Sequence, residues 1–320
     1  MKKISLHIYI VLGLFVVAFI LGSIFDQQIS QAIFSRDNTF GLVLSAIGTI
    51  PGYGCLALSG GALVYLTLFR VGKEKLAHKI IGFALAIFAF GMGVYFSGRE
   101  FFGRNGFFEV LPKFVGYFIA LVPMFGCAFL GFKLAEKSDN PHLWLVLIVF
   151  LIAIFLALVP GVTLIKAIFH RPRYRMITSV EMQALDLVGF KHWWERCANY
   201  KDIMAQYNAV YGQNALVSEE FKSFPSGHAG ASAVTLILAV ILPFFNKKYQ
   251  KIQIPVFYIG LAWCLFICWS RIFVGAHFLS DVSMGAILSL IFALITYFVL
   301  NKSKLFNGHS LEEPVEEIEA

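Results

Sequence analysis

Three short stretches hold the residues of this sequence that could bind and cleave a charged ester. They are KAIFHRPRYR at residues 166–175, PSGH at residues 225–228 and SRIFVGAHFLSD at residues 270–281. Each stretch adjoins a long apolar run, and ionisable side chains at membrane depth are costly enough to mark a functional site. The candidate residues are Lys166, Arg171, Arg173, Ser226, His228, Arg271, His277 and Asp281.

The basic residues of these stretches suit a phosphate group. Lys166 and Arg173 are separated by about two helical turns. Arg271 adds a third strong cation, and the fork of a guanidinium matches the geometry of phosphate oxygens. Ser226 and Gly227 stand where the next apolar run begins, and a helix start offers unpaired N–H groups to an oxyanion. We therefore expect these residues to hold a phosphoryl group.

The two histidines could divide the chemistry between them. His277 and Asp281 are four residues apart, so on a helix they share a face. A carboxylate bound to one ring nitrogen fixes the tautomer and leaves the lone pair of the other nitrogen free to attack. His228, on a different helix, could then protonate the leaving oxygen. The pattern predicts a nucleophile at His277 and a general acid at His228.

Together the three stretches resemble the signature of the type 2 phosphatidic acid phosphatase (PAP2) superfamily, which is K-x6-RP, PSGH and SR-x5-H-x3-D. The resemblance covers roughly residues 143–300 and implies a six-helix catalytic core. It also implies metal-free hydrolysis of a phosphomonoester or pyrophosphate through a phosphohistidine at His277, with His228 as the general acid. The residues it implies for holding the phosphoryl group are Lys166, Arg173, Ser226, Gly227 and Arg271.

The first stretch departs from the family pattern. Arg173 is followed by Tyr174, and the proline comes one residue earlier, at Pro172. Because a proline forces the preceding residue out of a helix, this stretch should end in a turn. Arg171 and Arg173 both stay open as the motif arginine, although the spacing favours Arg173.

A long insert at residues 174–222 separates the first two stretches. Residues 178–181 fit a capping box that starts one helix, and Gly212 could end another. Trp193 and Trp194 fit an anchor at a membrane interface. Two interpretations remain open for the insert, a decorated outer loop or a lid that selects the substrate head group.

The composition indicates a membrane protein. The sequence is 58% hydrophobic and 14% charged, which is more apolar and less charged than a soluble domain. A helix that spans the bilayer core needs roughly 20 apolar residues. Such runs predict an all-α, polytopic helical bundle of about eight transmembrane helices. They are residues 4–25, 53–69, 80–97, 114–132, 143–164, 229–245, 254–269 and 282–300.

The charges of the loops predict the orientation. Lysine and arginine follow alternate runs, and the positive-inside rule makes that side cytoplasmic. Both termini are then cytosolic in a plasma (inner) membrane, with all three stretches at the outer face. The first run lacks a small-x-small cleavage site and reads as a retained anchor rather than a signal peptide. Residues 40–50 are too short to span and predict an interfacial or re-entrant helix.

The remaining features predict the domain boundaries and exclude some classes of partner. We expect transmembrane helices at residues 1–140, a catalytic core at 141–300 and a disordered cytosolic tail at 301–320. Four of the five cysteines lie in apolar runs and read as core residues. No basic block with interleaved aromatics suggests a nucleic-acid partner, and no acidic or histidine spacing suggests a metal or other cofactor.

Three function classes fit the sequence. The leading one is an integral-membrane phosphatase that acts on a lipid phosphate or diphosphate, such as phosphatidate, phosphatidylglycerol phosphate or a polyprenyl diphosphate. The second is a haloperoxidase with vanadate in the phosphate site. The eight membrane runs argue against it, because the haloperoxidases of this superfamily are soluble. The third is an anion-binding transporter, but a transporter would place its charges near the bilayer midplane rather than at helix ends on one side.

Overall fold

The computed structural model describes residues 2–36, 38–72, 75–102 and 113–302 of the chain. It is 81% helix, and the described residues form no strand. Within them, eight helices are long and apolar enough to cross a membrane, which confirms the predicted polytopic bundle. The main helix of each span is α1 (Lys2–Ile33), α3 (Ile50–Phe69), α4 (Leu76–Arg99), α5 (Lys113–Glu136), α6 (Leu143–Leu158), α11 (Gly227–Phe245), α12 (Gln250–Phe273) and α13 (Leu279–Lys302).

Shorter helices connect the spans and build the region outside them. They are α2 (Thr39–Ile47), η1 (Glu100–Phe102), η2 (Val159–Leu164), α7 (Ile165–Phe169), α8 (Tyr174–Ile177), α9 (Val180–Leu185), α10 (Tyr200–Tyr211), η3 (Ser218–Phe221) and η4 (Lys247–Tyr249). The expected short helix at residues 40–50 corresponds to α2. The tail expected to be disordered falls mainly on residues 303–320, outside the described residues.

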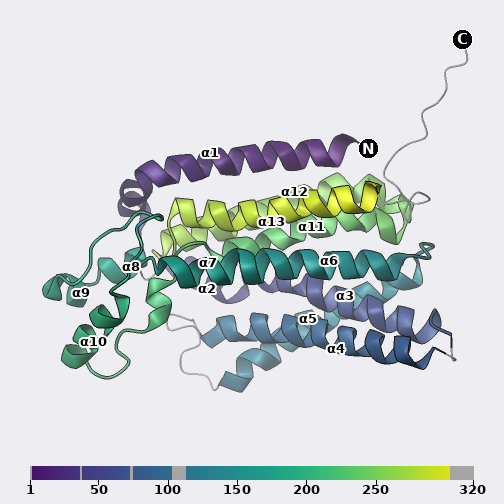
Figure 1. The fold of residues 1–320 in the computed structure, drawn as a ribbon, viewed down its shortest axis with the longest axis horizontal. Coiled ribbons are helices and arrows are strands. Elements are labelled where there is room, and N and C mark those ends of the chain that lie inside the picture. Colours follow the sequence, from purple (N-terminus) through teal and green to yellow (C-terminus); the bar gives the residue numbers. More distant parts are fainter. Residues whose placement is uncertain (1, 37, 73–74, 103–112, 303–320) are drawn as a thin grey trace, which may run out of the picture.

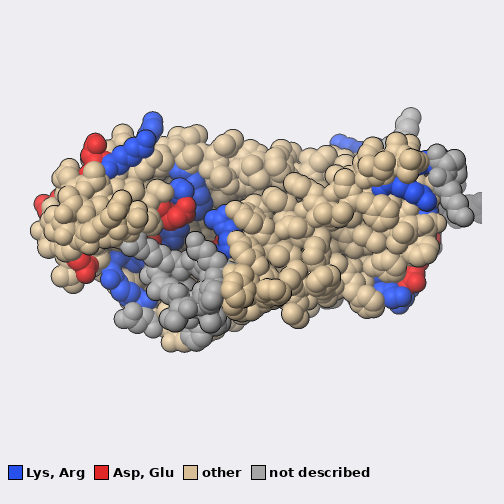
Figure 2. Space-filling model, turned by 90° about the horizontal axis from the view of Figure 1, so that it is seen from below, with Lys and Arg blue, Asp and Glu red and all other residues tan. Residues whose placement is uncertain are grey.

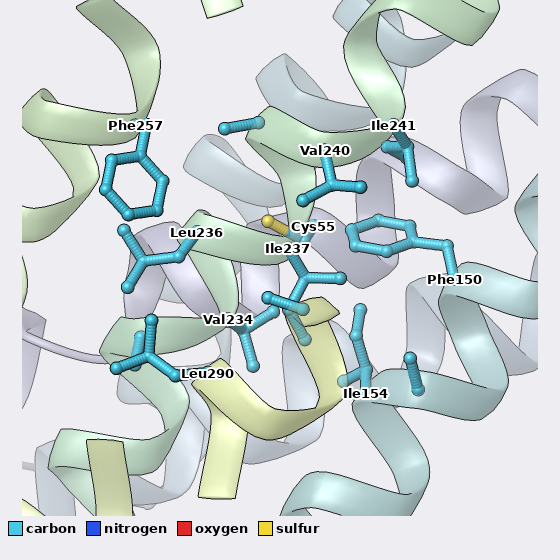
Figure 3. Close-up of a cluster of buried hydrophobic side chains, with 14 of the residues drawn as sticks. Cys55, Phe150, Ile154, Val234, Leu236, Ile237, Val240, Ile241, Phe257 and Leu290 are labelled. Carbon is cyan, nitrogen blue, oxygen red and sulfur yellow. The ribbon is translucent and has the colours of Figure 1, made fainter. Parts of the chain in front are cut away.

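α11 is the central helix of the bundle, and most of its side chains are buried. α13, α12, α6 and α3 pack around it, while α1 lies along the outer side of α13 (Figure 1). α3 also packs on α4 and α5 and so connects these two helices to the core. Figure 3 shows the side chains that pack in this apolar core. Side chains of α11 such as Val234, Ile237 and Ile241 meet Phe150 of α6 and Leu290 of α13.

Glycines allow α3 and α5 to pack backbone against backbone. A Cβ atom at Gly61 would lie 1.8 Å from the carbonyl oxygen of Ala128, and one at Gly131 would lie 1.9 Å from that of Leu58. In a bilayer, burial of apolar surface contributes little free energy to helix association. Small residues at the contact favour association because they let the backbones pack closely.

α1 is longer than the apolar run that predicted it. The run ends at residue 25, yet the helix continues to Ile33 through a kink at Phe25, whose φ and ψ are −117° and 15°. The next residue, Asp26, is 1% exposed and packs into the protein instead of entering a loop. The predicted run ended too early because an acidic residue normally marks the start of a solvent-exposed loop. The sequence does not show that this carboxylate is buried and has partners inside the protein.

The chain bends just before the first basic stretch. The helical ladder of α6 widens into the π-helical turn η2, which contains Pro160, and a proline cannot donate the regular helix hydrogen bond. α7 follows and ends at His170 in the left-handed conformation, with φ +48°. Residue 173 is then extended, so the predicted turn after α7 is present.

The insert at residues 174–222 folds at one end of the bundle, opposite the start of α1 and the end of α13 (Figure 1). The helix predicted to start at the capping box of residues 178–181 is α9, but its cap lies one residue later than that pattern places it, because Ser179 and not Thr178 accepts a hydrogen bond, from the Met182 backbone N–H at 3.2 Å. Gly212 ends α10 with φ +102°, as predicted. Trp193 connects the insert to α1, because its indole N–H donates to Ser23 Oγ at 2.9 Å.

Candidate active site

The three basic and polar stretches meet at the end of the bundle that carries the insert. Lys166 lies on α7, Ser226 caps the start of α11, and Arg271 lies in the last turn of α12. His277 occupies the turn between α12 and α13, and Asp281 lies in the first turn of α13. Residues more than 100 positions apart in the sequence thus share one site.

The candidate phosphate-binding residues surround the start of α11. Ser226 Oγ accepts from the Ala229 N–H at 3.4 Å and so orders the first turn of the helix. A Cβ atom at Gly227 would come within 4.0 Å of the Lys166 ammonium, so a larger side chain there would grow into the space beside that cation. Lys166 Nζ donates to the carbonyl of Lys222 at 2.9 Å.

The two arginines of this group differ in how they are held. The Arg271 guanidinium is 3% exposed and donates to the carbonyl oxygen of Gly41 on α2. The buried Nε of Arg173 finds no hydrogen-bond partner among the residues that the structure describes. A buried guanidinium N–H without a partner is costly, and an oxyanion would satisfy it.

His277 is buried and held in one tautomer. Its Nδ1 lies 2.6 Å from the carbonyl oxygen of Ser223 and 3.8 Å from Asp281 Oδ2. Because a carbonyl oxygen only accepts, Nδ1 must carry the proton, and the lone pair is on Nε2. Burial lowers the pKa of His277 to about 3; the nearby Asp281 raises it, and the positive charges of Lys166 and Arg173 lower it.

Asp281 reaches His277 less directly than the spacing suggested. Its carboxylate accepts hydrogen bonds from Arg171 Nη1 at 2.6 Å, Ser223 Oγ at 2.5 Å and the Phe278 N–H at 2.8 Å. The tautomer of His277 is therefore set first by the backbone of residue 223, and Asp281 fixes the Ser223 side chain and adds negative charge close to the ring. A main-chain carbonyl leaves no signal in the sequence, so sequence analysis missed this contact.

His228 is the second histidine, on α11, and its partners come from α2 and η1. Its Nε2 lies 2.9 Å from the carbonyl oxygen of Ser45 and 3.4 Å from Glu100 Oε2. The carbonyl of Ser45 is available because it lies in the last turn of α2, where carbonyls have no partner within the helix. With Nε2 engaged, Nδ1 is the nitrogen of His228 that could serve a leaving group.

Glu100 is a site residue that sequence analysis missed. Burial raises the pKa of its carboxyl, while the positive charges of Arg99, Lys166, Arg271 and Arg173 act in the opposite direction. Three of those cations belong to the candidate phosphate site. Glu100 follows α4 as an isolated acidic residue, so its position in the sequence gave no reason to select it.

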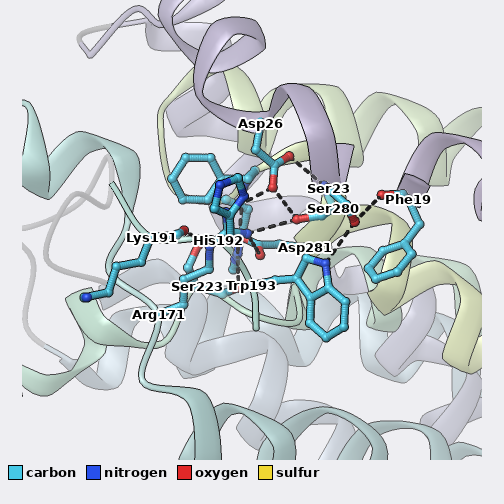
Figure 4. Close-up of polar contacts among 12 residues, drawn as sticks. Phe19, Ser23, Asp26, Arg171, Lys191, His192, Trp193, Ser223, Ser280 and Asp281 are labelled. Atoms are coloured by element: carbon cyan, nitrogen blue, oxygen red, sulfur yellow. Dashed lines mark hydrogen bonds and ion pairs between the residues drawn. The ribbon is translucent and has the colours of Figure 1, made fainter. Parts of the chain in front are cut away.

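Arg171 is the centre of a buried cluster that adjoins the candidate site through Asp281, drawn in Figure 4. It donates to Asp281 on one side and to Asp26 of α1 on the other, at 2.6 Å and 3.0 Å. It also donates to Ser280 Oγ at 2.9 Å and to the carbonyl of Lys191 at 2.9 Å. All of these hydrogen bonds go to other groups of the protein. The guanidinium also stacks on an aromatic ring, with Cζ 4.0 Å from the centroid of Phe278.

The surface charges agree with this location of the site. Figure 2 shows Lys and Arg side chains beside a recess near the insert, with acidic side chains among them. In this view the described residues along the middle of the bundle are uncharged, which suits a belt in contact with lipid acyl chains. Among the described residues, no three His, Cys, Asp or Glu side chains are grouped as they would be around a metal ion.

The fold defines a multi-pass helical membrane protein, and the candidate phosphate-binding residues lie at one end of its bundle. The model of the PAP2 superfamily matches residues 141–305, more than half of the chain, and the chain belongs to this superfamily. Membership supports a phosphatase-type hydrolase that acts on phosphate esters. Searches of curated proteins and of solved structures each found no match.

Proposed function

We propose that the protein hydrolyses a lipid phosphate monoester or diphosphate at the outer face of the membrane, through a phosphohistidine at His277. The observation that carries the proposal is the tautomer of His277. Its Nδ1 is held by the carbonyl of Ser223 at 2.6 Å, which leaves the Nε2 lone pair as nucleophile beside Lys166 and Arg173.

The reaction balances with the groups present. The Nε2 lone pair of His277 forms the P–N bond while the P–O bond to the leaving group breaks, and protonated His228 gives its proton to that oxygen. A water molecule then attacks the phosphorus atom and returns a proton to His228. The P–N electron pair goes back to His277, and inorganic phosphate leaves.

The phosphoryl oxygens would be held by Lys166, Arg173, Ser226, Gly227 and Arg271. Of the two arginines of the first stretch, Arg173 suits this role because its Nε lacks a partner within the described residues, whereas Arg171 is bound to two carboxylates. Such preorganised donors stabilise charge as it develops in the transition state.

The position of the site at the end of membrane-spanning helices supports a lipid substrate. The test is phosphate release in detergent from phosphatidate, phosphatidylglycerol phosphate, a polyprenyl diphosphate and a soluble phosphoester. We expect at least one lipid to be hydrolysed faster than the soluble ester. Binding of phosphate without release from any ester would instead indicate an anion-binding transporter.

The two histidines are separated by leaving-group chemistry. His277→Ala should abolish turnover and covalent labelling by a phosphate-labelled substrate. His228→Ala should lose about 10²–10⁴ in rate with alkyl esters and much less with a nitrophenyl ester, whose leaving group needs little protonation. Equal responses of both variants to the leaving group would refute the division of roles.

The mechanism uses no metal, so a strong chelator should leave activity intact. Vanadate should inhibit, because its five-coordinate adduct resembles the transition state of phosphoryl transfer. If chelation removed activity and a divalent cation restored it, the phosphohistidine mechanism would be wrong.

The outer location rests on the positive-inside pattern. Cysteine in place of Gln213, in the insert, should react with an impermeant thiol reagent on intact cells. Cysteine in place of Lys248, at the opposite end of the bundle, should react only after the membrane is opened. The reverse result would place the chemistry in the cytosol.

A further inference from the structure

Asp26 lies outside the region matched by the family, yet it is joined to the reacting centre. Its Oδ2 accepts from Arg171 Nη2 at 3.0 Å and from Ser280 Oγ, and its Oδ1 accepts from the Ser280 N–H at 3.0 Å. On the other side of the same guanidinium is Asp281, which is 3.8 Å from the His277 ring. α1 is therefore connected through Arg171 to the proposed nucleophile.

The cation and the hydrogen-bond donors around Asp26 favour its ionised form, and we take it as ionised. Three groups donate to its two oxygens, and a carboxylate that accepts several hydrogen bonds is stabilised in its charged form. Asp281 likewise accepts three hydrogen bonds. Close packing maintains this arrangement, because a Cβ atom at Gly22 would lie 2.4 Å from the backbone nitrogen of Ser280.

The charges of this cluster are unbalanced before the reaction. Arg171 carries one positive charge, Asp26 and Asp281 each carry one negative charge, and His277 is neutral. The sum is −1. When Nε2 of His277 bonds to phosphorus while Nδ1 keeps its proton, the ring gains a positive charge, and the same four side chains become neutral overall.

We propose that Asp26 is a positioning residue that supplies the second negative charge needed to balance the imidazolium of phosphorylated His277. The phosphoryl group on Nε2 carries negative charge of its own, which the cations proposed to hold it offset. Without Asp26, Arg171 would neutralise Asp281, and the protein would supply no net negative charge on the Nδ1 side of the ring. A charge in a buried site is strongly disfavoured unless it is paired. The inference rests on the proposed phosphohistidine mechanism.

The first test is Asp26→Asn in the full-length protein in detergent, which removes the charge and keeps the shape. We expect phosphoenzyme formation on His277 to slow by about ten- to thirty-fold, by the same factor for alkyl and nitrophenyl esters, with KM little changed. Asp186→Asn is the matched control, because Asp186 is exposed in the insert and its left-handed backbone suits asparagine. It should leave the rate unchanged.

The second test separates charge from structure. Asp26→Asn combined with Arg171→Gln removes both extra charges, so the phosphorylated cluster is again neutral. We expect the double variant to form the phosphoenzyme faster than Asp26→Asn alone. A purely structural contact predicts the opposite, since two sets of hydrogen bonds are lost. Asp26→Asn alone leaves Arg171 paired with Asp281 and so buries no unpaired charge. It can therefore be assayed even if the double variant, which leaves Asp281 without its cation, fails to fold.

Failure of this inference and failure of the proposed function give different results. Wild-type protein that forms phosphohistidine while Asp26→Asn forms it at the same rate would overturn the role of Asp26 alone. A double variant slower than Asp26→Asn would overturn it as well. Absence of phosphohistidine in the wild-type protein during turnover would overturn the proposed mechanism, and with it this inference.

Discussion

Arg171 and Arg173 are two residues apart and have opposite surroundings. The Arg171 side chain is completely buried, and its hydrogen bonds go to two carboxylates, a hydroxyl and a carbonyl of the protein. Arg173 is partly exposed, and its Nε has no partner within the described part of the chain. An arginine whose donors are used internally organises a site, whereas one with a donor left over is suited to bind a ligand.

The same contrast holds between two regions of the chain. The family-matched region, residues 141–305, contains every candidate residue that the motifs predicted. The region before it contributes several of the groups that hold them, namely Asp26 for Arg171, the Gly41 carbonyl for Arg271, and the Ser45 carbonyl and Glu100 for His228. The N-terminal helices therefore contribute to the structure of the candidate site and are not only membrane spans.

The largest effect is expected from Arg171→Ala. It leaves Asp26 and Asp281 buried without the cation that they share, and removing one partner of a buried ion pair costs about 3–5 kcal/mol. Thermal unfolding in detergent should show the loss, together with the loss of activity. A variant as stable as the wild-type protein would show that the cluster does not need its cation.

Arg173→Ala should reverse that pattern. It removes a donor proposed to act on the phosphoryl group, so we expect activity to fall by about 10²–10³ with little change in thermal stability. Arg196→Ala, at an exposed position in the insert, is the matched control and should retain both. Equal losses of stability in the Arg171 and Arg173 variants would contradict the comparison.

Acid should destabilise the fold through His277. Its pKa is about 3 in the folded protein and near 6.5 when unfolded, so between these values only the unfolded state binds the proton. The contribution of His277 to the free energy of unfolding is therefore complete above pH 6.5 and decreases as the pH is lowered toward 3. At pH 5 the decrease is roughly 2 kcal/mol.

Unfolding of the wild-type protein and His277→Asn at pH 7 and pH 5 measures this effect, because the variant lacks the titrating ring. We expect the variant to lose less stability between the two pH values. An equal loss in both proteins would show that His277 is protonated in the folded state or that other groups dominate.

The smallest effect is expected from Glu100→Gln. The carboxylate shares the cations that phosphate would use, so its neutral replacement should tighten substrate binding and lower KM on the order of threefold. Glu181→Gln, at an exposed position on α9, should leave KM unchanged. A higher KM in Glu100→Gln would mean that this side chain helps to hold the cations in place.

The spans and the motif residues could be predicted from the sequence because each is a local pattern. A run of apolar residues must form a helix in a bilayer, since its backbone can be satisfied only internally, and all eight runs did so. The stretches around residues 166–175, 225–228 and 270–281 combine residue types whose chemistry suits phosphate in any context. They also lie at the same end of the bundle, as the alternation of the helices required.

The partners of those residues depend on contacts between distant segments. Asp26 and Glu100 are single acidic residues at helix kinks or ends, and the carbonyls of residues 45 and 223 belong to a backbone that every residue has. The packing of α1 on α13 brings Asp26 to the site, and the packing of α2 on α12 and on η1 brings the Ser45 carbonyl and Glu100. The sequence thus determined which side chains could react, while the tertiary structure decided which of them are paired, because burial and distance set the charge and tautomer of each group.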